Sequence, residues 1–443
     1  MDERERAYRA VYKIFFENGL SHEVLRESLD ESDRNREKAN KAFISRLVNG
    51  TTERWLTLTY LIEKQAGRPI TKIKPAIRVI LAMGIYQAFF MNVPESAAAN
   101  ESVKLAKNHS FGGLAGFVNG VLRNIFRLAA SFGQAGENKE KCFEAFLENK
   151  LDNEEEDKKL SVRFSVPGEL AGIMRNELGK EALQKTLEGF FKENSLCLYR
   201  LGSKCSEEEF EESLVKDKLS FIKKEETGLE KAYIIKTAVN PTSVECFKRG
   251  CCIVQNPSSV KACELLEVRG DEKALDVCAA PGGKAVHLAD RLKEGFVTAC
   301  DISEKKCLKI EENIKRTGLK NIAARTEDAT VFVPEFKEAF DIVIADLPCS
   351  GLGVISSKPD IRYKTSADDI KILAGIQKKI LENVTKYVKP GGLISFSTCT
   401  FTKQENEDNA EYIKSLGFAE LIRQRMLPDE DRDGFFVAIL KKQ

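Results

Sequence analysis

Hydrophobic and polar positions follow two different periods along the 443 residues of this chain. Across residues 1–128, apolar side chains recur every three or four positions, which is the spacing of helices with one buried face. The clearest such stretches are Ala7–Phe15, Ala42–Val48, Ile77–Tyr86 and Gly116–Phe126. The pattern predicts an all-helical N-terminal domain over residues 1–128.

The last 190 or so residues show short apolar runs of strand length instead. Ala274–Cys278 reads as a buried strand, Ala279–Gly283 as a tight turn of small residues, and Ala285–Leu292 as a helix. Strand, glycine turn and helix form the first unit of a dinucleotide-type α/β fold. Further strands are expected at Phe296–Asp301, Phe340–Asp346 and Leu393–Cys399, with a turn at Lys389–Gly392. Residues 256–443 are therefore predicted to form a Rossmann-like α/β domain.

The middle of the chain has no single pattern. Residues 129–160 are highly charged and poor in β-branched side chains, so we expect a linker that is helical only around Cys142–Leu147. Residues 161–255 mix helix and strand and predict a small α+β subdomain. Its expected elements are three helices and a strand, at Pro167–Leu178, Ala182–Glu193, Phe210–Lys216 and Ala232–Ile235.

Composition narrows the class of protein. The chain is 42% hydrophobic, which suffices for sizeable cores, and carries a net charge of only +1. It has no apolar run of about 18 residues and no signal peptide at its start, so we expect a cytoplasmic protein without a membrane contact. Twelve irregularly spaced cysteines fit a reducing compartment, and three histidines make a metal site improbable.

Polar residues follow several predicted strands at the point where each ends. Asp301 ends one strand, where such folds hold a ribose by its hydroxyls, and Asp328 follows another, where an acid meets an adenine amino group. Asp346 and Cys349 follow the next strand, and Cys399 ends the last. These residues predict one ligand site at the carboxyl edge of the sheet.

Three short motifs at this edge resemble a known family. Cys278-Ala-Ala-Pro-Gly-Gly-Lys284, Asp346-Leu-Pro-Cys-Ser-Gly351 and Ser397-Thr-Cys-Thr400 resemble the RNA 5-methylcytosine methyltransferases, and most of all the ribosomal small-subunit methyltransferase B (RsmB) family. Lys358–Tyr363 and Asp433–Phe436 are also similar to that family. The resemblance implies S-adenosylmethionine as cofactor, 16S rRNA or its early ribosomal precursor as partner, and a monomer.

The resemblance assigns the cofactor site to the glycine turn and the strand-end acids. Lys284 is expected to face either the cofactor carboxylate or Asp346. The residues assigned to the cofactor are Cys278, Ala279, Ala280, Pro281, Gly282, Gly283, Lys284, Asp301, Asp328 and Asp346.

The two strand-end cysteines fit the chemistry of cytosine methylation. Carbon 5 of cytosine becomes nucleophilic enough only after a thiolate adds to carbon 6. The residues alone leave Cys349 and Cys399 nearly equal as that nucleophile, because DNA cytosine methyltransferases use the Pro-Cys cysteine. The RsmB resemblance assigns attack to Cys399 and product release to Cys349, while Asp346 is placed to hydrogen-bond the cytosine edge.

The helical region resembles the RNA-binding fold of the antitermination factor NusB, with Asn119–Arg123 carrying much of the likeness. A basic stretch without acids lies in this region. A solvated charged face is one interpretation of it, and RNA contact is the other. The expected RNA-binding residues are Lys64, Arg68, Lys72, Lys74 and Arg78.

Two alternatives to the rRNA enzyme remain open at this point. One is a methyltransferase of the same fold acting on tRNA or protein. The other is a catalytically silent RNA-binding protein, against which the presence of Asp346, Cys349 and Cys399 argues.

Overall fold

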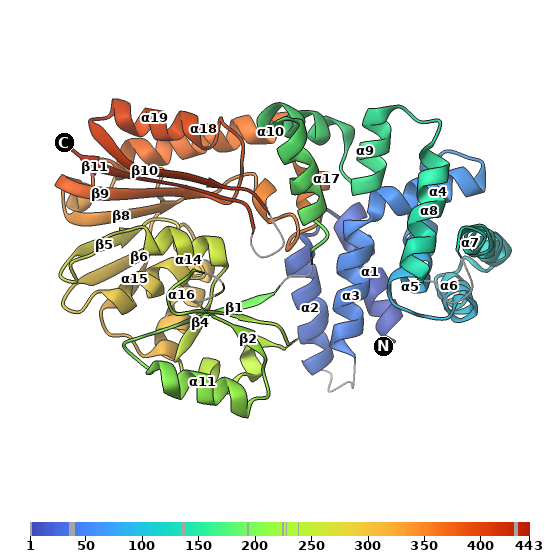
Figure 1. Ribbon diagram of the computed structural model, residues 1–443, viewed down its shortest axis with the longest axis horizontal. Coiled ribbons are helices and arrows are strands. Elements are labelled where there is room, and N and C mark those ends of the chain that lie inside the picture. Colours follow the sequence, from blue (N-terminus) through green and yellow to red (C-terminus); the bar gives the residue numbers. More distant parts are fainter. Residues whose placement is uncertain are drawn as a thin grey trace. The chain divides into compact units, whose positions relative to one another are not determined.

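A computed structural model describes residues 2–34, 40–133, 138–192, 195–223, 226, 228–237, 239–428 and 433–443 (Figure 1). The chain divides into two compact units. Unit 1 consists of Met1–Arg175 together with Ser357–Lys364, and unit 2 consists of Asn176–Ser356 and Thr365–Gln443.

Unit 1 is helical, as the sequence predicts. Its central helix, α5, begins with Pro75 and is buried around nearly its whole circumference, because Arg78 is its one charged residue. Helices α1, α3, α4, α6, α7 and α8 all contact α5. The helices of unit 1 as far as residue 130 are α1 (Glu3–Phe16), α2 (Ser21–Arg34), α3 (Lys41–Glu53), α4 (Trp55–Ala66), η1 (Ile70–Lys72), α5 (Pro75–Phe90), α6 (Glu95–Asn108), η2 (Gly112–Leu114) and α7 (Ala115–Ala130).

The segment 129–160, expected as a linker that is helical around Cys142–Leu147, contains that helical stretch and more helix besides. Two helices occupy its described part, α8 (Lys139–Leu151) and α9 (Glu156–Phe164). Phe143, Phe146, Leu147 and Leu151 of α8 lie in the same hydrophobic core as the preceding helices. Their spacing places them on one helix face, and the burial of that face outweighs the charged composition of the segment.

Helix α10 (Gly168–Gly189) follows, and it is broken at Gly179, whose φ of 70° and ψ of 174° are not helical. The break lies between the two helices that the sequence predicts here, and glycine tolerates this conformation because it has no Cβ. The predicted end of the second helix, Glu193, lies outside the described residues.

A small antiparallel sheet in unit 2 has the strand order β2-β3-β1-β4. Helix α11 beside it begins with a capping box, in which Ser206 and Glu209 bond each other's backbone N–H groups. This sheet lies within 161–255, for which a small RNA-binding subdomain remains a prediction. Its elements are β1 (Leu196–Arg200), α11 (Glu207–Lys216), β2 (Phe221–Ile222), β3 (Ala232–Ile235), η3 (Pro241–Ser243), α13 (Glu245–Lys248) and β4 (Cys252–Val254).

The larger sheet of unit 2 has seven strands in the order β10-β11-β9-β8-β5-β6-β7. The run from β9 to β7 is parallel, while β11 pairs antiparallel with both β9 and β10. This arrangement confirms the predicted Rossmann-like domain. The strands are β5 (Lys273–Asp276), β6 (Phe296–Asp301), β7 (Ile322–Thr326), β8 (Phe340–Asp346), β9 (Val388–Thr398), β10 (Phe418–Met426) and β11 (Phe435–Lys442).

One detail of this sheet differs from the prediction. Lys389–Gly392, expected as a turn, lies inside β9, where the register with β8 shifts between Phe340 and Ile342. Phe340 pairs with Val388, and Ile342 already pairs with Leu393, so the extra residues of β9 form an irregularity at its start.

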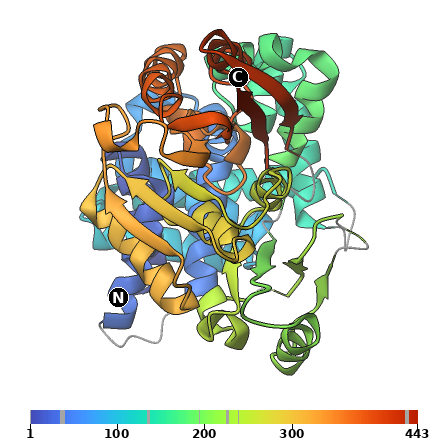
Figure 2. The ribbon, with the colours of Figure 1, turned by 90° about the vertical axis from the view of Figure 1, so that its left-hand side faces the viewer.

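Helices cover both faces of the large sheet. Successive residues of β5 point to opposite faces, so Ala274 packs in the core beneath α14 (Pro257–Glu264), α15 (Gly283–Arg291) and α16 (Glu304–Thr317), whereas Leu275 packs beneath α18 (Ala367–Val384) and α19 (Glu407–Ser415). Figure 1 shows α18 and α19 on one side of the strands and α14 to α16 on the other, and Figure 2 gives a second view. Two short helical turns, η4 (Pro334–Phe336) and η5 (Leu352–Val354), lie in the connecting loops.

The loop between β8 and α18 contributes a segment to unit 1. Residues 357–364, which include α17 (Ile361–Lys364), pack with the N-terminal helices. The fully buried Arg362 donates from Nη1 to the carbonyl oxygens of Phe164, at 3.0 Å, and Glu53, at 3.2 Å. Asp360 accepts hydrogen bonds from the backbone N–H and the hydroxyl of Ser21. The motif from Lys358 to Tyr363 therefore serves the packing of unit 1.

Among the described residues, none of the helices combines the length and the apolar composition that crossing a bilayer requires.

Candidate active site

The glycine turn after β5 is tied to the end of β6. The backbone N–H of Ala279 donates to the Cys300 carbonyl at 2.8 Å, and that of Ala280 donates to Asp301 Oδ2 at 3.1 Å. Gly282 has a φ of +101°, which side chains with a Cβ rarely adopt, and a Cβ there would lie 3.2 Å from Ile310. The turn therefore needs glycine, and it leads directly into the N-terminus of α15.

Three acids end adjacent strands at this edge of the sheet: Asp276 on β5, Asp301 on β6 and Asp346 on β8. Asp276 is fully buried, and its Oδ1 has no hydrogen-bond partner. Burial, together with the neighbouring charge of Asp346, raises the pKa of Asp276 to about 7. A buried acceptor without a partner at a strand end is what a ligand carrying a positive charge or N–H groups would satisfy.

Two of the three expected cofactor acids, Asp301 and Asp328, are already engaged in the protein. Asp301 accepts from the backbone N–H of Ile302 at 2.8 Å and lies 3.1 Å from Lys306 Nζ. Asp328 accepts from the backbone N–H and the hydroxyl of Thr330, at 2.9 and 2.7 Å. These bonds fix the orientation of both carboxylates at the ends of β6 and β7.

Lys284 contacts Asp346, one of its two expected partners. Its Nζ donates to Asp346 Oδ2 at 2.7 Å, and Ser397 donates to Oδ1 at the same distance. Burial acts to lower the pKa of Lys284, but the ion pair with Asp346 outweighs it and the pKa is raised. The Asp346 carboxylate is therefore held from two sides, by Lys284 at the start of α15 and by Ser397 of β9.

The two candidate cysteines meet although 50 positions separate them in the chain. Cys349 lies in the loop after β8 and Cys399 directly follows β9, and their sulfur atoms are 3.3 Å apart. Both are partly exposed. The hydrogen bond to Cys399, reinforced by burial, raises the pKa of Cys349 well above its ordinary value. A raised pKa disfavours the thiolate form of Cys349.

The remaining cysteine of the glycine turn, Cys278, differs from this pair. Burial raises the pKa of its thiol, as do the charges of Asp276 and Asp301. A thiol in such surroundings is unreactive, so Cys278 contributes its backbone and its volume to the turn.

Sequence reasoning missed two residues of this site. Asp276 was visible as the one charged residue of an apolar strand, and Ser397 lies within the Ser-Thr-Cys-Thr motif itself. What the sequence lacked was the pairing of β8 with β9 in register, which places Ser397 opposite Asp346.

The expected RNA-binding residues of unit 1 are not equivalent. Lys64 forms an ion pair with Glu154 at 2.6 Å, and Arg78 donates to the carbonyl oxygens of Ile73 and Thr71. Arg68, Lys72 and Lys74 are exposed. Arg68 lies over the ring of Phe117 and Lys74 over that of Phe111, at 5.1 and 5.2 Å from the ring centres.

Comparisons with known proteins agree with this organisation. The sequence model of the 16S rRNA methyltransferase RsmB/F family matches residues 263–441, and that of the NusB family matches residues 1–127. A probable ribosomal RNA small subunit methyltransferase B from Synechocystis is 31% identical over 430 residues, covering 91% of each chain. One from Bacillus subtilis is 29% identical over 463 residues, covering 99% of this chain and 98% of the relative.

Solved structures show the same fold. The crystal structure of PH0851 has a TM-score of 0.76 at 22% identity, covering 99% of this chain and 98% of its own. NSun6 from Pyrococcus horikoshii, solved with SFG, has a TM-score of 0.58 at 21% identity and covers 62% of this chain and 98% of its own. The orphaned acceptor of Asp276, the left-handed Gly282 and the oriented acids fit S-adenosylmethionine, the cofactor of these enzymes. The chain belongs to the RsmB/F family of 16S rRNA methyltransferases.

Proposed function

We propose that this protein transfers a methyl group from S-adenosylmethionine to carbon 5 of a cytosine in 16S rRNA, through a covalent adduct between Cys399 and carbon 6. The observation that carries the proposal is the contact of the two thiols, 3.3 Å apart, on the loops that follow β8 and β9, the strands of Asp346 and its partner Ser397. A methyltransferase acting on a nitrogen or oxygen atom has no need of a thiol pair. An attack on carbon 6 needs one thiolate and gains from a second group that handles protons.

Each side chain has a separate task in this scheme. The Cys399 sulfur bonds to carbon 6 and makes carbon 5 electron-rich, while Asp346 binds the cytosine edge. The cofactor supplies an electrophilic methyl group. The proton on carbon 5 then leaves, the bond between sulfur and carbon 6 breaks, and its electron pair returns to Cys399.

The contact with Cys399 gives Cys349 a role in product release in this proposal. The hydrogen bond between the two thiols is the first cause of the raised pKa of Cys349. Once Cys399 is bonded to carbon 6, its sulfur carries no charge and that cause disappears. Cys349 then loses its proton more readily and assists the removal of the carbon-5 proton.

The cofactor is assigned to the turn from Cys278 to Lys284, flanked by Asp301 and Asp328. We expect Asp301→Ala to weaken cofactor binding by about 1–3 kcal/mol, because ligand hydroxyls lose their acceptor. Isothermal titration with S-adenosylhomocysteine measures this loss. Glu304→Ala, an exposed acid of α16, serves as the control and should leave the affinity unchanged. Equal affinities for both variants and the wild type would remove Asp301 from the site.

The basic residues of unit 1 are assigned to rRNA. The chain has no Asp or Glu between Glu63 and Glu95, and Arg68, Lys72 and Lys74 are exposed within that interval. We expect the charge reversals Lys72→Glu and Lys74→Glu together to weaken rRNA binding. The slope of the logarithm of the binding constant against the logarithm of the salt concentration should become shallower by about 0.7–0.9 for each lost phosphate contact.

The matched control for these charge reversals is the pair Lys158→Glu and Lys159→Glu, on α9 of the same unit. Fluorescence anisotropy with a 16S rRNA fragment at several salt concentrations compares the two double variants. If both weaken binding equally, the loss reflects net charge, and Lys72 and Lys74 form no RNA site. Cofactor affinity should stay constant in both.

Bisulfite sequencing tests the substrate and the modified atom together. One cytosine of 16S rRNA should be protected from conversion in the wild-type strain, lose protection when the gene is deleted, and regain it with the wild-type gene but not with Cys399→Ala. Protection that persists in the deletion strain, or that changes only in tRNA, contradicts the proposal.

A further inference from the structure

Two adjacent residues beneath the cysteine pair, Glu405 and Asn406, are fully buried although both are polar. They precede α19, close in the chain to Cys399. A carboxyl group without solvent is costly unless hydrogen bonds replace the lost water. The partners of these two side chains therefore show what their burial achieves.

Glu405 holds the loop that carries Cys349. Its Oε1 accepts from the backbone N–H of Ser350 at 2.8 Å, and its Oε2 accepts from the Ser350 hydroxyl at 2.6 Å. Oε2 also accepts from the Thr402 hydroxyl at 2.7 Å, in the loop after Cys399. Gln377 of α18 completes the set, donating to Oε1 at 3.3 Å and to the Pro348 carbonyl at 2.9 Å. Both neighbours of Cys349 in the chain are thus fixed.

Asn406 does the same for Cys399. Its Oδ1 accepts from the Thr398 hydroxyl, and its Nδ2 donates to the Thr400 carbonyl at 3.0 Å. The two loops are also joined directly, since the hydroxyls of Ser350 and Thr400 are 2.8 Å apart. The residues on both sides of Cys399 and the one after Cys349 are therefore bonded to this buried dipeptide, and the one before Cys349 is bonded to Gln377, which also donates to Glu405.

We propose that Glu405 and Asn406 are positioning residues that hold the Cys349 and Cys399 thiols at the distance their reaction needs, Glu405 through the Cys349 loop and Asn406 through the residues flanking Cys399. The catalytic part of this inference rests on the function proposed above. Neither residue touches the reacting atoms.

The carboxylate of Glu405 suits this role better than an amide. Four donors converge on its two oxygens, and a glutamine would offer only one acceptor oxygen. The hydroxyls of Ser350 and Thr402 can rotate to accept from an amide N–H, so Glu405→Gln retains part of the network. Glu405→Ala retains none of it.

The test is disulfide trapping in the full-length protein without RNA or cofactor. The thiol oxidant diamide is added, and the Cys349–Cys399 disulfide is followed by peptide mass spectrometry. We expect trapping to slow several-fold in Glu405→Gln and in Ser350→Ala, and about tenfold or more in Glu405→Ala, because small displacements of reacting groups cost large factors in rate.

Charge and position predict opposite changes in this experiment. The charge of Glu405 contributes to the raised pKa of Cys349, after the hydrogen bond to Cys399 and burial, so its removal would speed trapping by making more thiolate. Slower trapping would therefore show that the two thiols have lost their position relative to each other. Trapping that is unchanged or faster in Glu405→Gln overturns the proposal.

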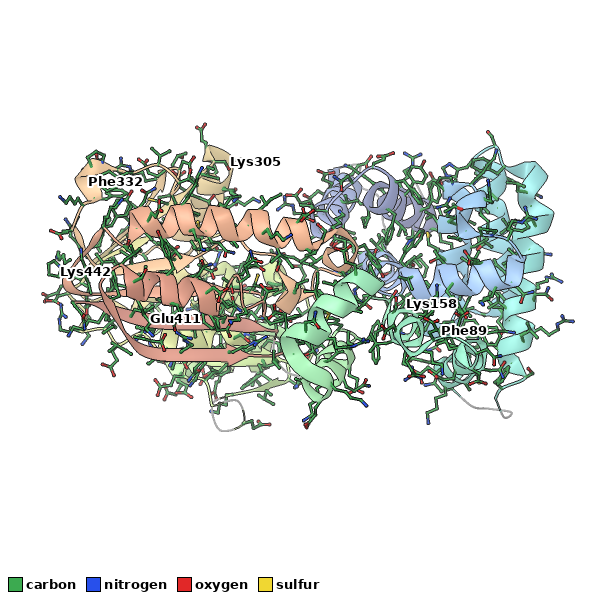
Figure 3. The ribbon with its side chains drawn as sticks, turned by 90° about the horizontal axis from the view of Figure 1, so that it is seen from above. Phe89, Lys158, Lys305, Phe332, Glu411 and Lys442 are labelled. Atoms are coloured by element: carbon green, nitrogen blue, oxygen red, sulfur yellow. The ribbon has the colours of Figure 1, made fainter. Side chains whose placement is uncertain are left out.

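The molecule contains its own control pair. The sulfur atoms of Cys246 and Cys252, in the small antiparallel sheet region, lie 3.9 Å apart. Their trapping rate should stay constant in every variant, and a parallel change in both pairs would show general loosening and overturn the proposal. Glu411→Gln makes the same chemical change on the exposed face of α19, where Figure 3 labels Glu411, and should trap at the wild-type rate.

Activity measurements separate positioning from mere stability. In Glu405→Gln the turnover number kcat should fall while the KM for RNA and the affinity for S-adenosylhomocysteine stay within about twofold. If kcat falls, the KM for RNA rises and the affinity for S-adenosylhomocysteine weakens together, in step with a lower melting temperature, the positioning role is overturned. Disulfide trapping needs no methyl transfer, so it tests the positions of the two thiols whatever their role in catalysis. If Cys399→Ala remains active, only the proposed function is refuted.

Discussion

Replacing Cys399 with alanine is expected to abolish methyl transfer, with a loss on the order of 10³-fold or more. Without a thiolate at carbon 6, carbon 5 of cytosine is too weak a nucleophile to accept the methyl group. The neighbouring Cys349 does not replace it, because its sulfur lies 3.3 Å from the position of the attacking sulfur, and small displacements of reacting groups cost large factors in rate.

Transfer of labelled methyl groups to 16S rRNA measures the Cys399→Ala effect. Cys142→Ala, a partly exposed cysteine of α8, is the matched control and should keep full activity. Binding of S-adenosylhomocysteine should be unchanged in both variants. Methyl transfer by Cys399→Ala at a rate near that of the wild type would show that another group attacks carbon 6, or that no attack occurs.

Replacing Cys349 with alanine is expected to have an opposite effect on the adduct. Cys399 still adds to carbon 6 and the methyl group is still transferred, but removal of the carbon-5 proton loses its assistance. The enzyme then remains bonded to its RNA, because the bond between sulfur and carbon 6 breaks only after that proton leaves. We expect a large fraction of the protein to be trapped as a covalent complex, of which the wild type shows only traces.

The trapped complex should also carry a methyl group. Digestion with ribonuclease and mass measurement of the cysteine peptide should find a methylated nucleotide on the peptide that contains residue 399. The target base must leave any stack to reach the thiols, so single-stranded loops of the rRNA should be trapped better than paired segments. A nucleotide without the added methyl would place the block before transfer and assign Cys349 to an earlier step.

The fold followed from the sequence wherever one pattern decided the structure. Strand β6 has the predicted bounds, Phe296–Asp301, because both the apolar run and the acid that ends it can be seen in the sequence. Only Cys142–Leu147 of helix α8 was predicted, because charged residues surround Phe143 and Phe146, and the helical spacing of these two rings becomes decisive only once a core exists to receive them. The irregular start of β9 depends on its register with β8, which no local pattern contains.

The sequence predicts at which strand ends the candidate residues lie, but not which of them are in contact. Parallel strands place their carboxyl ends at one edge, which was enough to gather Asp301, Asp346 and Cys399. The contact between Cys349 and Cys399 spans 50 positions and requires the tertiary structure. Glu405 was not anticipated, because an acid at the start of a helix is usually a solvated surface residue and its four donors come from three separate segments.

The central claim is a covalent adduct through Cys399 that Cys349 resolves, and one denaturing gel tests it most directly. Labelled 16S rRNA is incubated with S-adenosylmethionine and with the wild type, Cys399→Ala, Cys349→Ala or the double variant. We expect a slowly migrating RNA–protein band with Cys349→Ala that disappears in the double variant and is absent with Cys399→Ala. A band with Cys399→Ala and none with Cys349→Ala would reverse the two roles. No band with either variant, alongside normal methylation by both, would contradict the cysteine mechanism altogether.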